Sequence, residues 1–273
     1  MQRHRKIFSK KTGFRPSPHE SQSSVPYRLS MAARGVSIVI PAYNEESFLP
    51  ATLAAANEAC AHFSASHNFP WEIVVVNNAS TDRTEAVALS HGAKVVLHEV
   101  RNISSVRNVG IKAASYDLIV MIDADSFLPL DGLVKIWSVM ESHQYVGGSL
   151  GVKVLTEKVG LKILAPIFQY LVDLTSGIQG AMFFFWRDAA IEIGGFSEDR
   201  LVAEDSVFAI SLRRYGVKKN QKFLRLRTVI VGTLDRKDSD LRTLLSMVFK
   251  AFQGLIGVKQ SKEDLKYWYE PKR

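Results

Sequence analysis

Short apolar runs alternate with helical patterns along most of the chain from Gly35 onward. Four runs rich in valine and isoleucine predict buried strands, at residues 36–40, 72–76, 94–98 and 118–122. After the first run, which we expect Pro41 to break, apolar side chains recur at helical spacing: Leu49, Leu53, Ala56, Cys60 and Phe63. Strands that alternate with helices are typical of βαβ units. We therefore predict an α/β fold with a mostly parallel central sheet flanked by helices, in one main domain spanning residues 35–235.

The fourth apolar run stops abruptly at two acids, Asp123 and Asp125, which one alanine separates. Residues i and i+2 of an extended segment point the same way, so both carboxylates can face one hard cation such as Mg²⁺ or Mn²⁺. Ligands of open α/β sheets bind just beyond such strand ends. A cation there would neutralise a departing diphosphate, which both phosphate transfer and sugar transfer require. Taken alone, the acid pair is better explained as a helix cap or a turn.

The second half of the chain is less regular and more aromatic. Helical spacing over 163–174 predicts a helix that Pro166 kinks. The apolar run 181–186 is too unbroken for a strand with one solvated face. Further along we predict a tight turn at 194–196, a helix that Glu204 and Asp205 open and residues 213–216 close, a strand at 223–231, and an amphipathic helical segment within 236–273.

The positive charge of the chain is concentrated near its N-terminus. Residues 1–35 carry eight basic side chains against the single acid Glu20, a net charge of +7 out of +8 for the whole chain. Serine, proline and the absence of any period predict a disordered basic arm over residues 1–34. The arm is either an electrostatic tether to anionic lipid or a solvated tail. Because the remainder is nearly neutral, we expect no nucleic-acid partner.

Cysteine usage and apolar run lengths bear on location. The single cysteine, Cys60, cannot form an intrachain disulfide, so a reducing compartment is the simplest inference and we predict a cytoplasmic protein. Charged residues interrupt each apolar segment that approaches the length of a membrane span. Three features nonetheless indicate peripheral contact with the inner face of a membrane: the basic arm, the amphipathic residues 241–256 and the aromatic cluster 183–186. Core packing or a solvated tail explains each of them equally well.

Six short blocks, in order, carry a resemblance to one family. They are Val-Ser-Ile-Val-Ile-Pro-Ala-Tyr-Asn-Glu-Glu at 36–46, Asn-Asn-Ala-Ser-Thr-Asp at 77–82, Arg-Asn-Val-Gly at 107–110, Asp-Ala-Asp at 123–125, Gly-Gly-Phe at 194–196 and Glu-Asp at 204–205. Together the blocks resemble the family 2 glycosyltransferases, which depend on nucleotide sugars and have the Rossmann-like GT-A fold. The resemblance implies transfer of a sugar from a nucleoside-diphosphate sugar to a hydroxyl acceptor, in the synthesis of a cell-envelope glycan or glycolipid.

The resemblance also implies how the nucleotide sugar is bound. Pro41, Ala42 and Glu45 resemble the wall that holds the nucleoside, and Asn77 stands where the family usually has an aspartate facing the base. An amide there removes a charge and adds donor hydrogens, which puts pairing with uracil in doubt. A UDP-sugar is favoured over a GDP-sugar as the partner. Arg107 and Asn108 resemble residues at the edge of the nucleotide and its phosphates, with Gly110 allowing close approach.

The remaining residues carried over from the family perform the chemistry. Asp125 would bind Mg²⁺ or Mn²⁺ directly, and Asp123 would bind the ribose or a metal-bound water. Asp205 matches the family's general base, with Glu204 as its neighbour, and the displacement would invert the anomeric centre. Relatives often supply a histidine near residues 232–237, where this chain has none, so we name no third metal ligand.

Two other functions compete with a glycosyltransferase. A non-catalytic sensor or scaffold that binds nucleotide sugars would have the same fold, and Asn77 favours it while Asp125 and Asp205 argue against it. A sugar nucleotidyltransferase ought to carry a glycine-rich, arginine-bearing loop after the first strand, which residues 41–46 lack. Residues between Gly147 and Phe196 are apolar enough to suggest a lipid-linked or aromatic acceptor.

Overall fold

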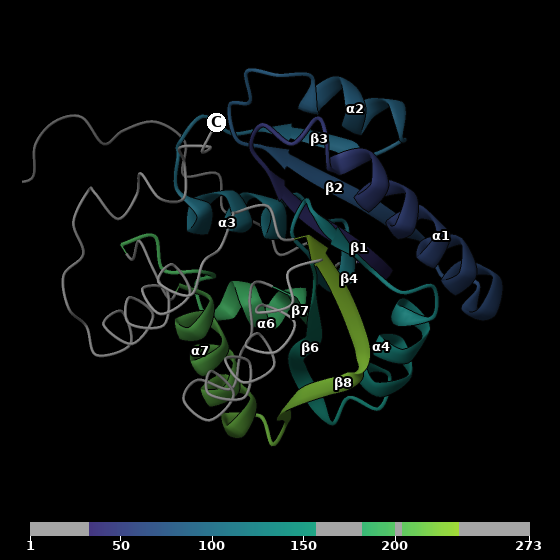
Figure 1. The fold of residues 1–273 in the computed structure, drawn as a ribbon. Coiled ribbons are helices and arrows are strands. Elements are labelled where there is room, and N and C mark those ends of the chain that lie inside the picture. The colour runs from purple at the N-terminus through teal and green to yellow at the C-terminus, as the bar shows by residue number, and fades with distance from the viewer. Residues whose placement is uncertain (1–32, 157–181, 200–203, 235–273) are drawn as a thin grey trace, which may run out of the picture. The chain divides into compact units, whose positions relative to one another are not determined.

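The computed structural model describes residues 33–156, 182–199 and 204–234, which belong to one compact unit (Figure 1). Its strands are β1 (Ala33–Ala42), β2 (Trp71–Asn77), β3 (Lys94–Leu97), β4 (Tyr116–Met121), β5 (Ser126–Phe127), β6 (Tyr145–Leu155), β7 (Phe183–Trp186) and β8 (Lys222–Leu234). Its helices are α1 (Leu49–His67), α2 (Thr84–Ser90), α3 (Ile103–Ala113), α4 (Gly132–Met140), α6 (Arg187–Glu192) and α7 (Glu204–Lys218).

The described strands form one eight-stranded sheet in the order β3-β2-β1-β4-β7-β6-β8-β5. The neighbours from β3 to β4 are parallel, and β6 is parallel to β8. Strand β7 is antiparallel to both of its neighbours, and β5 is antiparallel to β8. The sheet is therefore mostly parallel, as the alternation of strands and helices predicted, and the α/β fold is confirmed.

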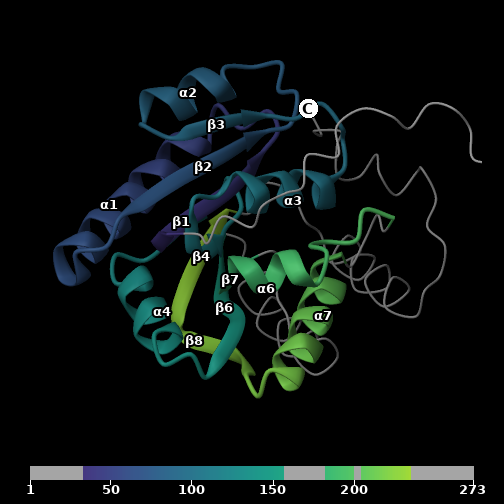
Figure 2. The ribbon, with the colours of Figure 1, turned by 180° about the vertical axis from the view of Figure 1, so that it is seen from behind.

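Helices cover both faces of this sheet, and each face has its own apolar core. Helices α1, α2 and α4 pack on one face, where the first helix buries all five apolar residues that the sequence placed at helical spacing. Helices α3, α6 and α7 pack on the other face, over Val39 of β1 and over Phe183 and Phe185 of β7. Figure 2, which shows the unit from behind, places α3, α6 and α7 together along one side of the sheet.

Strand β1 does not end before Pro41, so that expectation was wrong. Pro41 pairs with Val76, and the strand continues to Ala42. Alternate residues of a parallel strand direct their backbone groups to opposite neighbours; Val39 bonds toward β4 and Ala42 toward β2. Pro41 therefore faces the β4 side, beyond the last β4 pair at Val39 and Met121, where no donor is needed.

Helix α7 continues two residues past the predicted stop at 213–216, to Lys218. Gly216 was read as a helix-ending residue but lies inside the helix. A Cβ atom at Gly216 would lie 2.7 Å from Cγ1 of Val146 in β6. The glycine is there because it lets α7 approach the sheet closely, rather than because the helix must end.

The aromatic cluster 183–186 is part of the core, so its reading as a membrane-contacting feature was wrong. Phe183, Phe184 and Phe185 are fully buried. Strand β7 lies between β4 and β6 with a core on each face, which explains why its sequence is unbroken in hydrophobicity. Residues 1–32 of the basic arm, the predicted helix over 163–174 and the amphipathic residues 241–256 lie outside the described residues. Ala33 and Arg34 are the first residues of β1, so the predicted end of the arm at residue 34 was two residues too late. Within the described ranges, no helix is long and apolar enough to cross a membrane.

Candidate functional site

The loops that follow β1 and β2 are tied together by side-chain hydrogen bonds. Asn44, in the left-handed conformation with φ +54°, donates its backbone N–H to Ser80 Oγ at 3.0 Å, and its Oδ1 accepts from the N–H of Thr81 at 2.8 Å. The backbone N–H of Glu45 donates to Thr84 Oγ1 at 2.7 Å. Two of the resembling blocks, 36–46 and 77–82, thus form one continuous surface at the carboxyl end of the sheet.

The residues expected to hold the nucleoside lie at the ends of β1 and β2 or in the loop after β1. Pro41, Ala42 and Asn77 are buried, and Ala42 pairs directly with Asn77 across the β1–β2 ladder. The side-chain oxygen of Asn77 accepts from the backbone N–H of Ser80 at 3.0 Å. This oxygen shapes the loop after β2, a role that an aspartate would fill equally well. Glu45 is also buried and lies at the start of the loop after β1.

Asp123 and Asp125 occupy a turn after β4, so the expectation that both lie in an extended segment was wrong. The strand ends at Met121, and the turn is closed by a hydrogen bond from the N–H of Ser126 to the carbonyl of Asp123, because β5 starts immediately and runs back along β8. The two carboxylates have different surroundings. The Asp123 side chain is 38% exposed, whereas Asp125 is buried.

Asp125 is fixed to the last described strand. Its Oδ1 lies 3.4 Å from the hydroxyls of Ser126 and of Thr233 in β8, and its carbonyl accepts from the N–H of Leu234 at 3.3 Å. Sequence reasoning missed Thr233, because the contact joins residues 108 positions apart. A small polar residue at the end of an otherwise apolar strand, beside Gly232, was the one available signal.

Arg107 of α3 connects the turn after β4 to the start of α7. Its Nη1 donates to Glu204 Oε1 at 2.7 Å, and its Nη2 lies 3.9 Å from Asp123 Oδ1. The guanidinium lies over the ring of Phe196, 5.3 Å from its centroid. Arg107 is buried, and the three carboxylates of Glu204, Asp123 and Asp205 keep it charged by raising its pKa against the effect of burial. Residues that the sequence placed in separate blocks therefore meet at one arginine.

Asp205, the expected base, lies beside this ion pair in the first turn of α7. Removal from water, together with the adjacent Glu204 carboxylate, raises the pKa of its carboxyl to about 6. Arg107 and the N–H of Ser206, which donates to Asp205 Oδ1 at 2.6 Å, act in the opposite direction. A carboxylate with this pKa is charged at neutral pH but binds a proton more readily than an ordinary aspartate. These are the properties of a general base.

Asn108 contacts the turn after α6. Its Oδ1 accepts from the N–H of Phe196 at 2.7 Å, and its Nδ2 donates to the Phe196 carbonyl at 2.9 Å and to Glu198 Oε1 at 2.8 Å. The side chain is buried. The turn has the predicted form, with φ +84° at Gly194 and +73° at Gly195.

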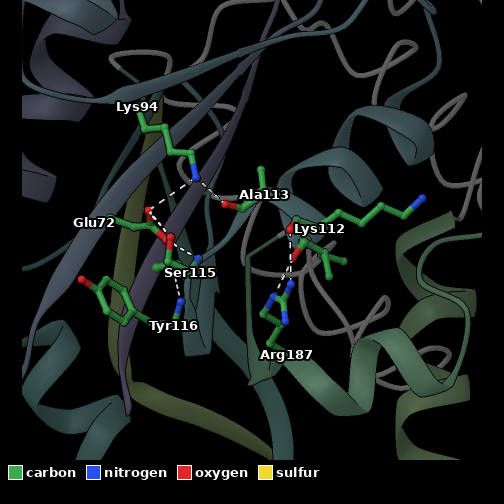
Figure 3. Close-up of polar contacts among 9 residues, drawn as sticks. Glu72, Lys94, Lys112, Ala113, Ser115, Tyr116 and Arg187 are labelled. Carbon is green, nitrogen blue, oxygen red and sulfur yellow. Dashed lines mark hydrogen bonds and ion pairs between the residues drawn. The ribbon is translucent and has the colours of Figure 1, made fainter. Parts of the chain in front are cut away.

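Helix α3, which carries Arg107 and Asn108, is held at its C-terminal end by two cations (Figure 3). Arg187, the first residue of α6, donates from Nε to the carbonyl of Ile111 at 3.1 Å and from Nη2 to that of Lys112 at 3.2 Å. Lys94 Nζ donates to the carbonyl of Ala113 at 2.7 Å. Positive charge at a helix C-terminus satisfies the last carbonyls and complements the helix dipole.

Gly110 brings α3 close to the sheet. A Cβ atom there would lie 2.3 Å from Cγ1 of Val39. The close approach that the sequence suggested for Gly110 is therefore between helix and strand. Arg187 was not singled out from the sequence, although a charged residue directly after the apolar run 181–186 was a signal that the strand ended there.

The donor set at the turn after β4 suits a hard divalent cation. Asp123 and Asp125 offer carboxylate oxygens, and the neighbouring hydroxyls of Ser126 and Thr233 are also oxygen ligands. Mg²⁺ is commonly held by one or two carboxylates together with substrate phosphates, so two aspartates are sufficient. In residues 33–156, 182–199 and 204–234, no three His, Cys, Asp or Glu side chains gather as a metal-binding group.

Comparison with known families gives one match over more than half of the chain. Residues 37–191 match the profile described as glycosyl transferase family 2. A dolichyl-phosphate beta-glucosyltransferase of Trichomonas vaginalis is 27% identical over 181 residues, which are 60% of this chain and 55% of that protein. The chain spans about half the length of the curated relatives it matches.

Solved structures share the fold at low sequence identity. TarS residues 1–349 from Staphylococcus aureus, in complex with UDP-GlcNAc, aligns with a TM-score of 0.60 at 15% identity, over 84% of this chain and 68% of that one. A mannosyltransferase from Pyrobaculum calidifontis, in complex with GDP-Man and Mn²⁺, aligns with a TM-score of 0.60 at 18% identity, over 83% and 63% of the two chains. At these identities the likeness supports the arrangement of helices and strands alone.

Proposed function

Because the chain belongs to glycosyltransferase family 2, we propose that it transfers a sugar from a nucleoside-diphosphate sugar to an acceptor hydroxyl, with inversion and with the help of Mg²⁺ or Mn²⁺. The observation that carries this proposal is the pair of carboxylate sites that Arg107 joins, Asp123 at the turn after β4 and Glu204 beside Asp205 at the start of α7. Sugar transfer requires charge neutralisation at the leaving diphosphate and a base near the acceptor.

Asp205 is the base in this proposal. As the acceptor oxygen forms its bond to the anomeric carbon, the hydroxyl proton passes to the Asp205 carboxylate. The bond from the anomeric carbon to the diphosphate oxygen breaks, and the electron pair leaves with the nucleoside diphosphate. Attack from the face opposite the leaving group inverts the anomeric configuration. The pKa of about 6 keeps Asp205 deprotonated and receptive at neutral pH.

The sugar donor would occupy the surface formed by the loops after β1 and β2. Pro41, Ala42, Glu45 and Asn77 line the nucleoside side, and Asp123 would contact the ribose or a metal-bound water. Asp125 would hold the cation, which supplies positive charge to the departing diphosphate when bound. A UDP-sugar is our first candidate and a GDP-sugar the second, and the two solved structures above were determined with one nucleotide of each kind.

The presence of a base indicates which of two chemical groups on the acceptor attacks the sugar, a hydroxyl or a phosphate. A hydroxyl must lose its proton during attack, so it requires a carboxylate such as Asp205. A phosphate oxygen is already anionic near neutral pH and attacks without a base. We therefore propose a hydroxyl acceptor, carried on a lipid or glycan. A lipid-linked phosphate is the second candidate, because the Trichomonas vaginalis relative is named a dolichyl-phosphate glucosyltransferase.

Calorimetric titration with UDP- and GDP-sugars in the presence of Mn²⁺, followed by a transfer assay, tests the proposal. The wild type should bind one class of sugar nucleotide and turn it over. Asp205→Asn should retain binding within about threefold and lose about 10²–10⁴-fold in kcat. Asp125→Asn should weaken Mn²⁺-dependent binding by at least about tenfold.

Two other outcomes would contradict parts of the proposal. Binding without turnover, unchanged by Asp205→Asn, would identify a non-catalytic sensor of nucleotide sugars. Full turnover by Asp205→Asn with a polyprenyl phosphate acceptor would support glycosyl transfer but show that the acceptor group is a phosphate and not a hydroxyl.

A further inference from the structure

We propose that Asn108 is a positioning residue that acts through Phe196 on helix α7, and so fixes the Asp205 carboxylate, rather than a contact for the nucleotide. The inference rests on the proposed glycosyl transfer for the meaning of Asp205. The coupling of Asn108 to α7 does not depend on the proposed function, because it is inferred only from contacts between described residues.

The polar atoms of the Asn108 side chain are engaged with the turn after α6. The oxygen accepts from the Phe196 N–H, and the nitrogen donates to the Phe196 carbonyl and to Glu198. An amide nitrogen has two hydrogens, and these two contacts use both. Asn108 thus holds both the N–H and the carbonyl of Phe196, which is 88 positions away in the sequence. The side chain has no donor hydrogen left for a phosphate or ribose.

The turn is shaped to receive Asn108. A Cβ atom at Gly195 would lie 2.3 Å from Asn108 Oδ1, and the φ of +73° at Gly195 is unfavourable for any other residue. A second amide, Asn102 at the N-cap of α3, donates to the carbonyl of Glu198 at 2.9 Å. Two asparagines of α3 therefore hold the segment 195–198 against the helix.

Phe196 transmits this position to α7. Its ring stacks on Phe208 of α7 with centroids 4.0 Å apart and planes inclined by 9°. Phe208 is fully buried against Phe183 and Phe185 of β7, and it lies one helical turn after Glu204 and Asp205. The Arg107 guanidinium covers the Phe196 ring at 5.3 Å and pairs with Glu204. A displaced Phe196 would therefore shift α7 and also the Arg107 guanidinium that pairs with Glu204.

Helix α3 is a fixed reference for this arrangement. Arg187 and Lys94 hold its C-terminal carbonyls, as Figure 3 shows, and Gly110 seats it against Val39. Arg187 also begins α6, whose end leads into the turn that Asn108 holds. The short segment from Arg187 to Glu198 is thus attached to α3 at both of its ends, so α3 can determine where the turn and Phe196 lie.

The test uses the full chain with Asn108→Asp, which keeps the oxygen that accepts from the Phe196 N–H. The second oxygen of the new carboxylate faces the Phe196 carbonyl and Glu198, where the amide formerly donated, and repels both. Asn57→Asp is the matched control, because Asn57 also donates to one backbone carbonyl, that of His91, but lies on the opposite face of the sheet. Phe196→Leu removes the ring stack while keeping the backbone contacts, and serves if Asn108→Asp folds poorly.

Two measurements are made on each variant. Hydrogen exchange over residues 204–212 should become faster in Asn108→Asp and Phe196→Leu and stay unchanged in Asn57→Asp. A misplaced base should lower kcat by about 10–100-fold while the dissociation constant for UDP with Mn²⁺ changes by less than about threefold. Adding Glu198→Gln to Asn108→Asp removes one of the two repulsions and should recover part of kcat.

Unchanged exchange over 204–212 in both variants would overturn the positioning role whatever the kinetics. A rise of tenfold or more in the UDP dissociation constant with little change in kcat would also overturn it and identify Asn108 as a nucleotide contact. If the wild type transfers no sugar, the proposed function fails, while the exchange measurement still decides whether Asn108 positions α7.

Discussion

Glu204 and Asp205 are neighbours in the sequence but have different surroundings. Glu204 is neutralised by Arg107 at 2.7 Å, whereas Asp205 is partly buried and accepts a hydrogen bond from the N–H of Ser206. Burial and the adjacent carboxylate raise the proton affinity of Asp205. The pattern of charges makes Glu204 a structural anion and leaves Asp205 to accept a proton.

The pH dependence of activity should report Asp205. Its pKa of about 6 lies above the ordinary value of 3.8, so the basic form predominates only above pH 6. We expect kcat/KM to rise with pH through about 6 and then level off, in steady-state assays at saturating Mn²⁺. Asp205→Asn should remove this limb along with most of the activity. A residual rate with the same limb would assign the titration to another group.

The same carboxyl should affect stability with a defined sign. Because its pKa is higher in the folded state, the unfolded chain releases this proton first, and the group destabilises the fold increasingly as pH rises from about 4 through 6. Asp205→Asn should therefore raise the free energy of unfolding by about 1–3 kcal/mol at pH 8 and by much less at pH 4. Urea denaturation at the two pH values measures the difference, and an equal effect at both would contradict it.

Removing Arg107 should cost far more stability than removing a surface cation. Arg107→Met leaves the Glu204 carboxylate, whose side chain is 13% exposed, without its closest partner. We expect the free energy of unfolding to fall by about 3 kcal/mol. Lys135→Met, which breaks the exposed pair with Asp131, should cost less than about 1 kcal/mol. Glu204→Gln combined with Arg107→Met should recover part of the loss, and similar losses in the two single variants would refute the distinction.

At the scale of the elements, close packing of α3 on the sheet depends on Gly110. The methyl group of Gly110→Ala would overlap Val39, whose Cγ1 lies 2.3 Å from the Cβ position. We expect a loss of about 1–3 kcal/mol in unfolding free energy. Val39→Ala creates room on β1, so the double variant should be more stable than the sum of the single effects predicts. Additive effects in the double-mutant cycle would show that the helix relaxes away instead.

The sequence predicted those elements whose signal is local. Valine-rich strands and the spacing from Leu49 to Phe63 identify βαβ units because burial on one face imposes a period on the chain itself. Pro41 and Gly216 were misread as breaks. Pro41 fits within β1 because β4 no longer pairs at that position, and Gly216 fits within α7 because β6 lies close to the helix there. The turn at Asp123 and Asp125 was likewise read as extended. The strand that follows it, β5, is only two residues long and leaves no pattern in the sequence that would indicate a turn.

The candidate site was predictable as a set of residues but not as an arrangement. The resemblance indicated Arg107, Asn108 and the Glu204–Asp205 pair, yet their contacts join positions 88 and 97 residues apart. No periodicity encodes such a contact. The ion pair of Arg107 with Glu204 and the attachment of Asn108 to Phe196 became evident only when α3, the turn after α6 and α7 were placed side by side.

At the scale of the whole molecule, charge is distributed unevenly between the first 35 residues and the remainder. If the arm is a tether, the full chain should cosediment with vesicles that contain anionic lipid, and the fraction bound should fall as salt is raised. A chain lacking residues 1–32, which leaves β1 intact, should lose this binding and keep its activity on a soluble acceptor analogue. Equal binding of both chains, or of neither, would identify the arm as a solvated tail.

The contact between Asp125 and Thr233 joins the middle of the chain to the end of β8, the last strand described. A ribosome therefore completes every other described strand before it makes the one that secures this aspartate. A nascent chain that ends between residues 206 and 221 would carry both aspartates and the base, yet lack β8, the strand that β5 needs as its partner. We expect such chains to be inactive, so that catalytic competence arises only after β8 has been made.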